Sequence, residues 1–225
     1  MKNKLKFLRK ITVTALFATA AVSVYLFIFK IIADVIYAVG YNHEQYFEFD
    51  SIMIWLKSIM SAVIPLAYHL TVAVLSVMLA IRLLKNKNET LLLRIFCIIN
   101  AADCAYLVVT NGLFNQITYF GESLGNLNLL SVQRLITAAL LIAIAVLYNK
   151  NCSKPQANVL VILSVVQYLI YTSVSIVRLI ILTNLQNIIT PVYSTVISII
   201  AAVLAYLPLL LICILKRIDS HEEEL

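Results

Sequence analysis

Polar side chains recur every three or four residues between positions 164 and 178, in a segment otherwise built from Val, Leu and Ile. They are Ser164, Gln167, Tyr168, Tyr171, Thr172, Ser175 and Arg178. Because this spacing matches the period of an α-helix, they share one helical face, which in an apolar helix should avoid lipid. Such a face either lines a polar cavity or joins the helix to a neighbour through interhelical hydrogen bonds. Ser and Thr suit helix contact, whereas Gln167, both tyrosines and Arg178 are larger than close contact needs, which favours a cavity.

A second group of polar residues comprises the cations that lie apart from the basic connectors, namely Lys30, Lys57, Arg134 and Arg178. Each falls near or inside the outer end of a different apolar stretch, where desolvating a cation costs a few kcal/mol. One interpretation is a water-accessible vestibule whose ligand carries a carboxylate or phosphate, since Arg binds such groups with a planar fork. The other is snorkelling, or pairing with nearby acids, which are Asp34, Glu44, Glu48, Asp50 and Glu122. The second interpretation is favoured for the two lysines and both stay open for the arginines.

Asp103 is the carboxylate that falls at the middle of an apolar stretch, with Asn100 about one turn before it. Intramembrane acids are candidates for proton or cation coupling, or for a counter-ion. The alternatives are a structural hydrogen bond from a protonated Asp103, or an ion pair with His69 of the preceding stretch. We predict that Asp103, His69 and Asn100 couple or gate ligand movement. A lone histidine on an apolar face does not indicate a metal site.

Enzymatic chemistry has little support in this chain. It contains no HExxH, GxSxG, P-loop or CxxC motif, and no tight acidic pair of the kind that marks a membrane protease, hydrolase, nucleotidase or zinc enzyme. Cys97, Cys104 and Cys213 fall in apolar stretches and Cys152 in a connector, so we expect them to pack as small apolar residues. The sequence therefore predicts a protein that is not an enzyme and that needs no cofactor or metal.

The elements that position these residues are six apolar stretches, each long enough to cross a bilayer. The hydrophobic residue class makes up 62% of the chain and the mean hydropathy is +0.96, far above a soluble domain. We place the spans at residues 11–39, 54–84, 91–113, 129–148, 159–182 and 192–215. The expected fold is all-α, a polytopic six-transmembrane-helix bundle that forms a single domain over residues 1–225. Pro65 and Pro208 are the expected kink sites.

The basic residues predict how the bundle is oriented. Lys and Arg gather before the first span, around the second and fourth connectors and after the last span, all on one side of the membrane. Because cytoplasmic loops are rich in Lys and Arg, both termini should be cytoplasmic. Membrane topology thus accounts for the net charge of +6, and no nucleic-acid partner is expected. The first span continues too far for a cleaved signal peptide, and the Ile, Leu, Lys and Asn usage suggests a bacterial plasma membrane.

These features favour a membrane transport protein, or the solute-binding membrane subunit of a transporter, that captures a small anionic or zwitterionic solute from outside. Its expected ligand contacts are Arg134, Arg178, Gln167, Tyr168, Tyr171 and Ser175. The alternative is a non-enzymatic sensor, immunity or accessory protein whose polar helix faces are interaction surfaces. The expected partners are the lipid bilayer, the solute, and a partner membrane subunit or a second copy of the chain.

In its size and predicted topology, the chain is similar to the substrate-specificity subunits of energy-coupling-factor vitamin transporters. Ala15, Thr19 and Ser23 of the first span resemble the small-residue face with which those subunits dock to their transmembrane coupling partner. The resemblance implies six helices with both termini inside, and a docking role for this face.

Overall fold

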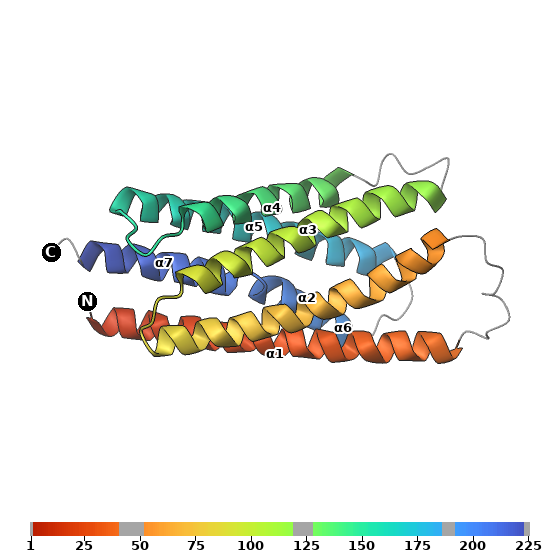
Figure 1. Ribbon diagram of the computed structural model, residues 1–225, viewed down its shortest axis with the longest axis horizontal. Helices are drawn as coiled ribbons and strands as arrows, with labels where there is room; N and C mark the ends of the chain where they lie inside the picture. The colour runs from red at the N-terminus through yellow and green to blue at the C-terminus, as the bar shows by residue number, and fades with distance from the viewer. Residues whose placement is uncertain (1, 41–51, 119–127, 186–191, 223–225) are drawn as a thin grey trace.

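The protein is helical throughout the part of the chain that the structure describes. The computed structural model describes residues 2–40, 52–118, 128–185 and 192–222, with no strand in these ranges (Figure 1). The helices are α1 Lys2–Gly40, α2 Ile52–Leu84, α3 Thr90–Thr118, α4 Asn128–Leu147, α5 Lys154–Leu185, α6 Val192–Leu204 and α7 Leu207–Glu222. Side chains are described for residues 4–32, 62–110, 131–177 and 196–220.

Five helical segments are long and apolar enough to cross a membrane. Within the described residues they are Lys4–Ile32, Ala62–Leu84, Thr90–Thr110, Lys154–Val177 and Val196–Ser220, with mean hydropathies between 1.9 and 2.8. A shorter apolar helix, Ser131–Leu147, lies in α4. Many large apolar side chains are also solvent-exposed in the isolated chain, Val146 by 71% and Ile162 by 62% of their surface. A soluble monomer rarely exposes so much apolar surface, so these are the features of a multi-pass helical membrane bundle.

The helices form a closed ring. Each of α1 to α5 packs on the next helix in the chain, α5 packs on both α6 and α7, and α7 packs back on α1. Both chain termini and the α2–α3 and α4–α5 connections lie at one end of the bundle, which we call the terminal end, and the opposite end is the far end (Figure 1). Lys and Arg gather at the terminal end, as Lys4, Lys6, Arg9, Lys10, Arg82, Lys85, Lys87, Arg94, Lys150, Lys154, Lys216 and Arg217.

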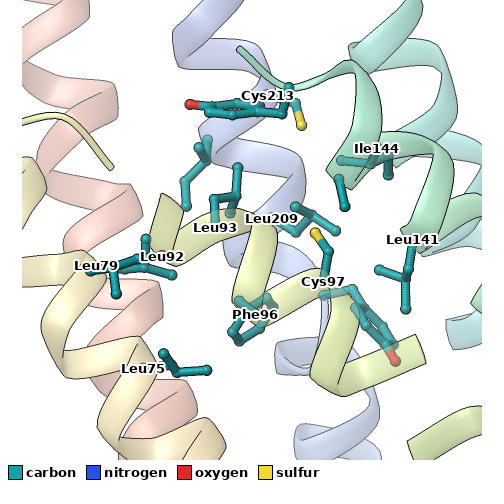
Figure 2. Packing of buried hydrophobic residues seen from close by; sticks show 14 of the residues in the cluster. Leu75, Leu79, Leu92, Leu93, Phe96, Cys97, Leu141, Ile144, Leu209 and Cys213 are labelled. Carbon is teal, nitrogen blue, oxygen red and sulfur yellow. The ribbon is translucent and has the colours of Figure 1, made fainter. Parts of the chain in front are cut away.

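A dry core fills the half of the bundle nearest the terminal end. Leu79 of α2, Phe96 and Cys97 of α3, Leu141 of α4 and Leu209 of α7 are each at most 1% exposed and belong to one cluster (Figure 2). Burying side chains of this size from water contributes about 1.5–3 kcal/mol each, although in lipid the gain comes mainly from close packing. The cluster connects α7 to α2, α3 and α4 across the inside of the ring.

Side-chain hydrogen bonds hold the connections at the terminal end. Arg94 Nε donates to the carbonyl of Tyr148 at 2.9 Å, and the Tyr148 hydroxyl donates to Glu89 Oε1 at 2.7 Å. Lys216 Nζ donates to the carbonyl of Lys150 at 2.6 Å. The α4–α5 connection is therefore fastened to both α3 and α7.

The last apolar span is interrupted at its middle. Helix α6 ends at Leu204 and α7 begins at Leu207, next to Pro208, where a kink is expected. Proline is tolerated in the first turn of a helix because the amide donors there lack intrahelical partners, and α7 therefore starts beside it. Pro65, the other expected kink site, instead lies inside the continuous helix α2.

The small-residue face of α1 is used inside the bundle. Ala15, Thr19 and Ser23 are each at most 6% exposed, and Thr19 Oγ1 donates to the carbonyl of Leu204 at 3.0 Å. That carbonyl belongs to the last turn of α6, where helix carbonyls lack intrahelical donors. This face stabilises the interruption between α6 and α7. It is covered by the protein's own helices, and the docking role implied by the resemblance stays a prediction.

Candidate functional site

A cavity of about 550 Å³ lies inside the ring, beyond the dry core. Each of α1 to α6 contributes side chains to it, together with the α6–α7 interruption. Its polar lining includes Ser23 of α1, His69 of α2, Asp103 of α3, Arg134 of α4, Tyr171 of α5 and Ser198 of α6. Its volume falls in the range of small-molecule sites, about 300–1,000 Å³.

Six of the expected ligand-binding and coupling residues meet in this cavity. Arg134, Tyr171 and Ser175 come from the expected ligand contacts, and Asp103, His69 and Asn100 from the expected coupling or gating group. Residues from four different helices are thus brought to one place, which periodicity along a single helix cannot predict.

Arg134 and Asp103 are a cation and an acid that lie close together in the cavity lining. Arg134 is partly buried and its Nη1 donates to the carbonyl of Leu107 on α3 at 3.3 Å. Asp103 lies four residues before Leu107, hence about one turn, or roughly 6 Å, along the same helix. The charges of Asp103 and Arg134 are close enough to interact. The cavity therefore presents a cation and a carboxylate side by side.

Tyrosines form the side of the cavity that adjoins the dry core. Tyr171 of α5 and Tyr206 of the α6–α7 interruption pack edge to face, with ring centroids 4.6 Å apart. The Tyr206 hydroxyl lies 3.9 Å from Cys104 Sγ, within hydrogen-bonding distance for sulfur. Gln133 Nε2 donates to the carbonyl of Tyr171 at 3.2 Å, which ties the pair to α4.

Asn100 and His69 both contact Tyr68. The Tyr68 hydroxyl donates to Asn100 Oδ1 at 2.9 Å, and Asn100 Nδ2 donates to the carbonyl of Phe96 at 2.7 Å. The His69 ring is tilted by 59° against the ring of Tyr68, with centroids 5.3 Å apart. Asn100 is 2% exposed, and its two hydrogen bonds fix Tyr68 against the cavity.

Two expected ligand contacts lie away from the lining. Gln167 is fully buried, and neither atom of its amide group has a hydrogen-bond partner among the described residues. Tyr168 packs against the dry core. The polar face of α5 therefore has two parts. The part nearer the terminal end lies among packed helices, whereas Tyr171 and Ser175, nearer the far end, line the cavity. Arg178 lies in α5, but its side chain falls outside the described residues.

Of the two lysines singled out with the arginines, only Lys30 has a described side chain. Lys30 of α1 is partly buried and lies outside the lining. Lys57 belongs to α2, but its side chain is not among those described. The side chains of the acids considered as pairing partners also fall outside those described; these acids are Asp34, Glu44, Glu48, Asp50 and Glu122.

Tyr206, Tyr68 and Gln133 also line the cavity, but they are not among the site residues expected from the sequence. Tyr206 lies in an apolar run without a periodic set of polar neighbours, so its place at the cavity depends on how the helices pack. Gln133 could have been found, because it directly precedes Arg134 at the start of an apolar helix.

The described residues hold no cluster of three or more His, Cys, Asp or Glu side chains that could bind a metal ion. No family model, curated protein or solved structure matches this chain. Its function is therefore inferred from the cavity.

Proposed function

We propose that the protein is a membrane transport protein, or the solute-binding membrane subunit of a transporter, that captures a small solute bearing an acidic group. The observation that supports this proposal is the placement of Arg134 at the wall of a cavity of about 550 Å³ among six helices. A guanidinium group offers a planar set of donors, and the carboxylate or phosphate group of a ligand matches their geometry.

The proposed orientation rests on the charges at the terminal end. We place the terminal end, with its twelve Lys and Arg residues named above, in the cytoplasm, and the bundle in a bacterial plasma membrane. The dry core then separates the cavity from the cytoplasm, because its side chains fill the ring between them. The solute accordingly reaches the cavity from the outer side, where Tyr171, Ser175 and Arg134 contact it.

The middle of the ring also offers a place for coupling or gating. Asp103, Asn100 and His69 line the same cavity as Arg134. A change in the charge or position of any of them would therefore change the affinity of the cavity for its ligand. Tyr171 and Tyr206 close the cavity towards the dry core, and opening that contact is the movement that transport requires.

A sensor or accessory protein is the second candidate. It is favoured by the packed part of α5, where Ser164 and Gln167 are fully buried away from the cavity, as an interhelical seam would be. Such a protein could bind the same solute without moving it.

Ligand binding tests the first part of the proposal. Purified protein in detergent is screened by thermal shift against carboxylates, phosphates and amino acids, in parallel with Arg134→Gln. Arg217→Gln is the matched control, because Arg217 is exposed at the terminal end. We expect at least one acid to stabilise the wild type and the control but not Arg134→Gln. A thermal-shift response that Arg134→Gln retains in full would contradict the proposed site. Where a ligand does bind through Arg134, its uptake into vesicles that contain the protein distinguishes a transporter from a sensor.

A further inference from the structure

The cavity carries a carboxylate as well as a guanidinium group. Asp103 and Arg134 come from neighbouring helices and line the same space. A site for a purely anionic ligand is weakened by a carboxylate at its wall, since like charges repel, and next to a protein wall they are screened less than in bulk water. The carboxylate of Asp103 is therefore better suited to a ligand that also carries a positive group.

Three tyrosines share the cavity with this carboxylate. Tyr68, Tyr171 and Tyr206 all line the cavity, and Asp103 lies within electrostatic range of Tyr68 and Tyr171. The faces of tyrosine rings attract ammonium groups, including fully methylated ones, through cation–π interaction. A cavity that presents both a carboxylate and aromatic rings therefore suits an amino or quaternary ammonium group.

The separation of the two charged residues limits the size of the ligand. Arg134 donates to the carbonyl of Leu107, and Asp103 lies about one helical turn away, roughly 6 Å along α3. A molecule whose ammonium and carboxylate groups are a few bonds apart can reach both residues at once.

We propose that the solute is a small zwitterion, a proposal that rests on the proposed function. Its ammonium group binds at Asp103 among the three tyrosines, and its carboxylate binds at Arg134. This assignment gives Asp103 direct contact with the ligand, in addition to the coupling or gating role expected for it.

The rival explanation is that Asp103 and Arg134 only neutralise each other and stabilise the bundle. The two explanations differ in one respect: a structural pair has no preference for an amino group on the ligand. The discriminating experiment therefore compares ligands that differ in that group alone.

The probes are L-amino acids and glycine betaine, each with the matched acid that lacks the nitrogen, such as leucine with 4-methylpentanoate and phenylalanine with 3-phenylpropanoate. Binding is measured by thermal shift and then by titration calorimetry on the wild type, Asp103→Asn and Arg134→Gln. We expect at least one zwitterion to bind the wild type tenfold or more tightly than its matched acid. Asp103→Asn should abolish this preference, whereas Arg134→Gln should weaken both members of the pair.

Comparing zwitterions with their matched acids on the wild type alone shows whether the site prefers an amino group, even if Asp103→Asn does not fold. Matched acids or phosphates that bind through Arg134 as tightly as the zwitterions would overturn this inference and leave the proposed function standing. A wild type that binds none of the acids, phosphates or zwitterions would overturn both.

Discussion

Tyr171 and Tyr206 pack edge to face across α5 and the α6–α7 interruption, with their ring planes at 82°. Tyr206 is 3% exposed, although it lies where the last span has lost its regular helix. This contact closes the cavity on the side of the dry core and connects the interrupted span to α5. Both the stability of the interruption and the closure of the cavity should therefore depend on the ring of Tyr206.

Replacing Tyr206 tests that dependence. Tyr206→Ala removes a large buried ring and should lower the free energy of unfolding by about 3–5 kcal/mol. Tyr206→Phe keeps the ring and loses the weak contact with Cys104 Sγ, so we expect a loss of about 1 kcal/mol or less. Thermal and denaturant unfolding in detergent measures both. Equal losses from the two variants would show that the hydroxyl group, not the ring, holds the interruption.

Two buried glutamines should respond in opposite ways to the same substitution. Gln133 donates a hydrogen bond to the carbonyl of Tyr171, whereas the amide of Gln167 has no partner among the described residues. Gln133→Met should therefore cost about 1 kcal/mol of stability, and Gln167→Met should be neutral or stabilising, because an apolar side chain of similar shape carries no unpaired polar group. Unfolding of the two variants in detergent checks this. A larger loss from Gln167→Met than from Gln133→Met would contradict it.

Cys152, in the connection between α4 and α5, should be a slow nucleophile. Burial raises the pKa of its thiol, and the nearby Lys216 ammonium offsets the effect only in part. Because the thiolate is the reactive form, a raised pKa means less thiolate at pH 8 and a reaction that speeds up as the pH rises further. Ser153→Cys provides the control, since Ser153 is the next residue and is exposed.

Mass spectrometry after limited treatment with N-ethylmaleimide measures labelling at both positions. We expect Cys152 to react several-fold more slowly at pH 8 than the cysteine introduced at position 153, with the difference narrowing at higher pH. Equal rates at pH 8 would mean that the connection does not shield the thiol.

The helices could be predicted from sequence because each apolar run has to satisfy its backbone hydrogen bonds internally. The span expected at 54–84 corresponds to α2, Ile52–Leu84, and the one at 129–148 to α4, Asn128–Leu147. The true ends differ where a helix continues into polar sequence, as at Lys2 of α1. The interruption at Tyr206 is only hinted at in the sequence, because Pro208 marks a place where a helix can break without showing where it does.

The candidate site could be predicted only in part, for a physical reason. Periodicity identifies which residues share a face of one helix, but not how deep in the bundle each lies. Gln167 and Tyr171 share the polar face of α5, yet about one turn separates a fully buried amide from a tyrosine at the cavity. Asp103 and Arg134 can be selected because charge is rare in apolar helices, and that criterion does not depend on depth.

Capture of a solute from outside requires above all that the cavity hold water reached from the far end. Ser175 lines the cavity, whereas Val177 on the same helix is 48% exposed on the outer surface of the bundle. Ser175→Cys and Val177→Cys are made separately in a chain whose own four cysteines are changed to Ala. Intact cells are then treated from outside with a charged, membrane-impermeant methanethiosulfonate. We expect the cysteine at position 175 to be modified and the one at position 177 to stay unmodified. A thiol at position 175 as unreactive as the one at 177 would contradict a water-filled, outward-facing cavity.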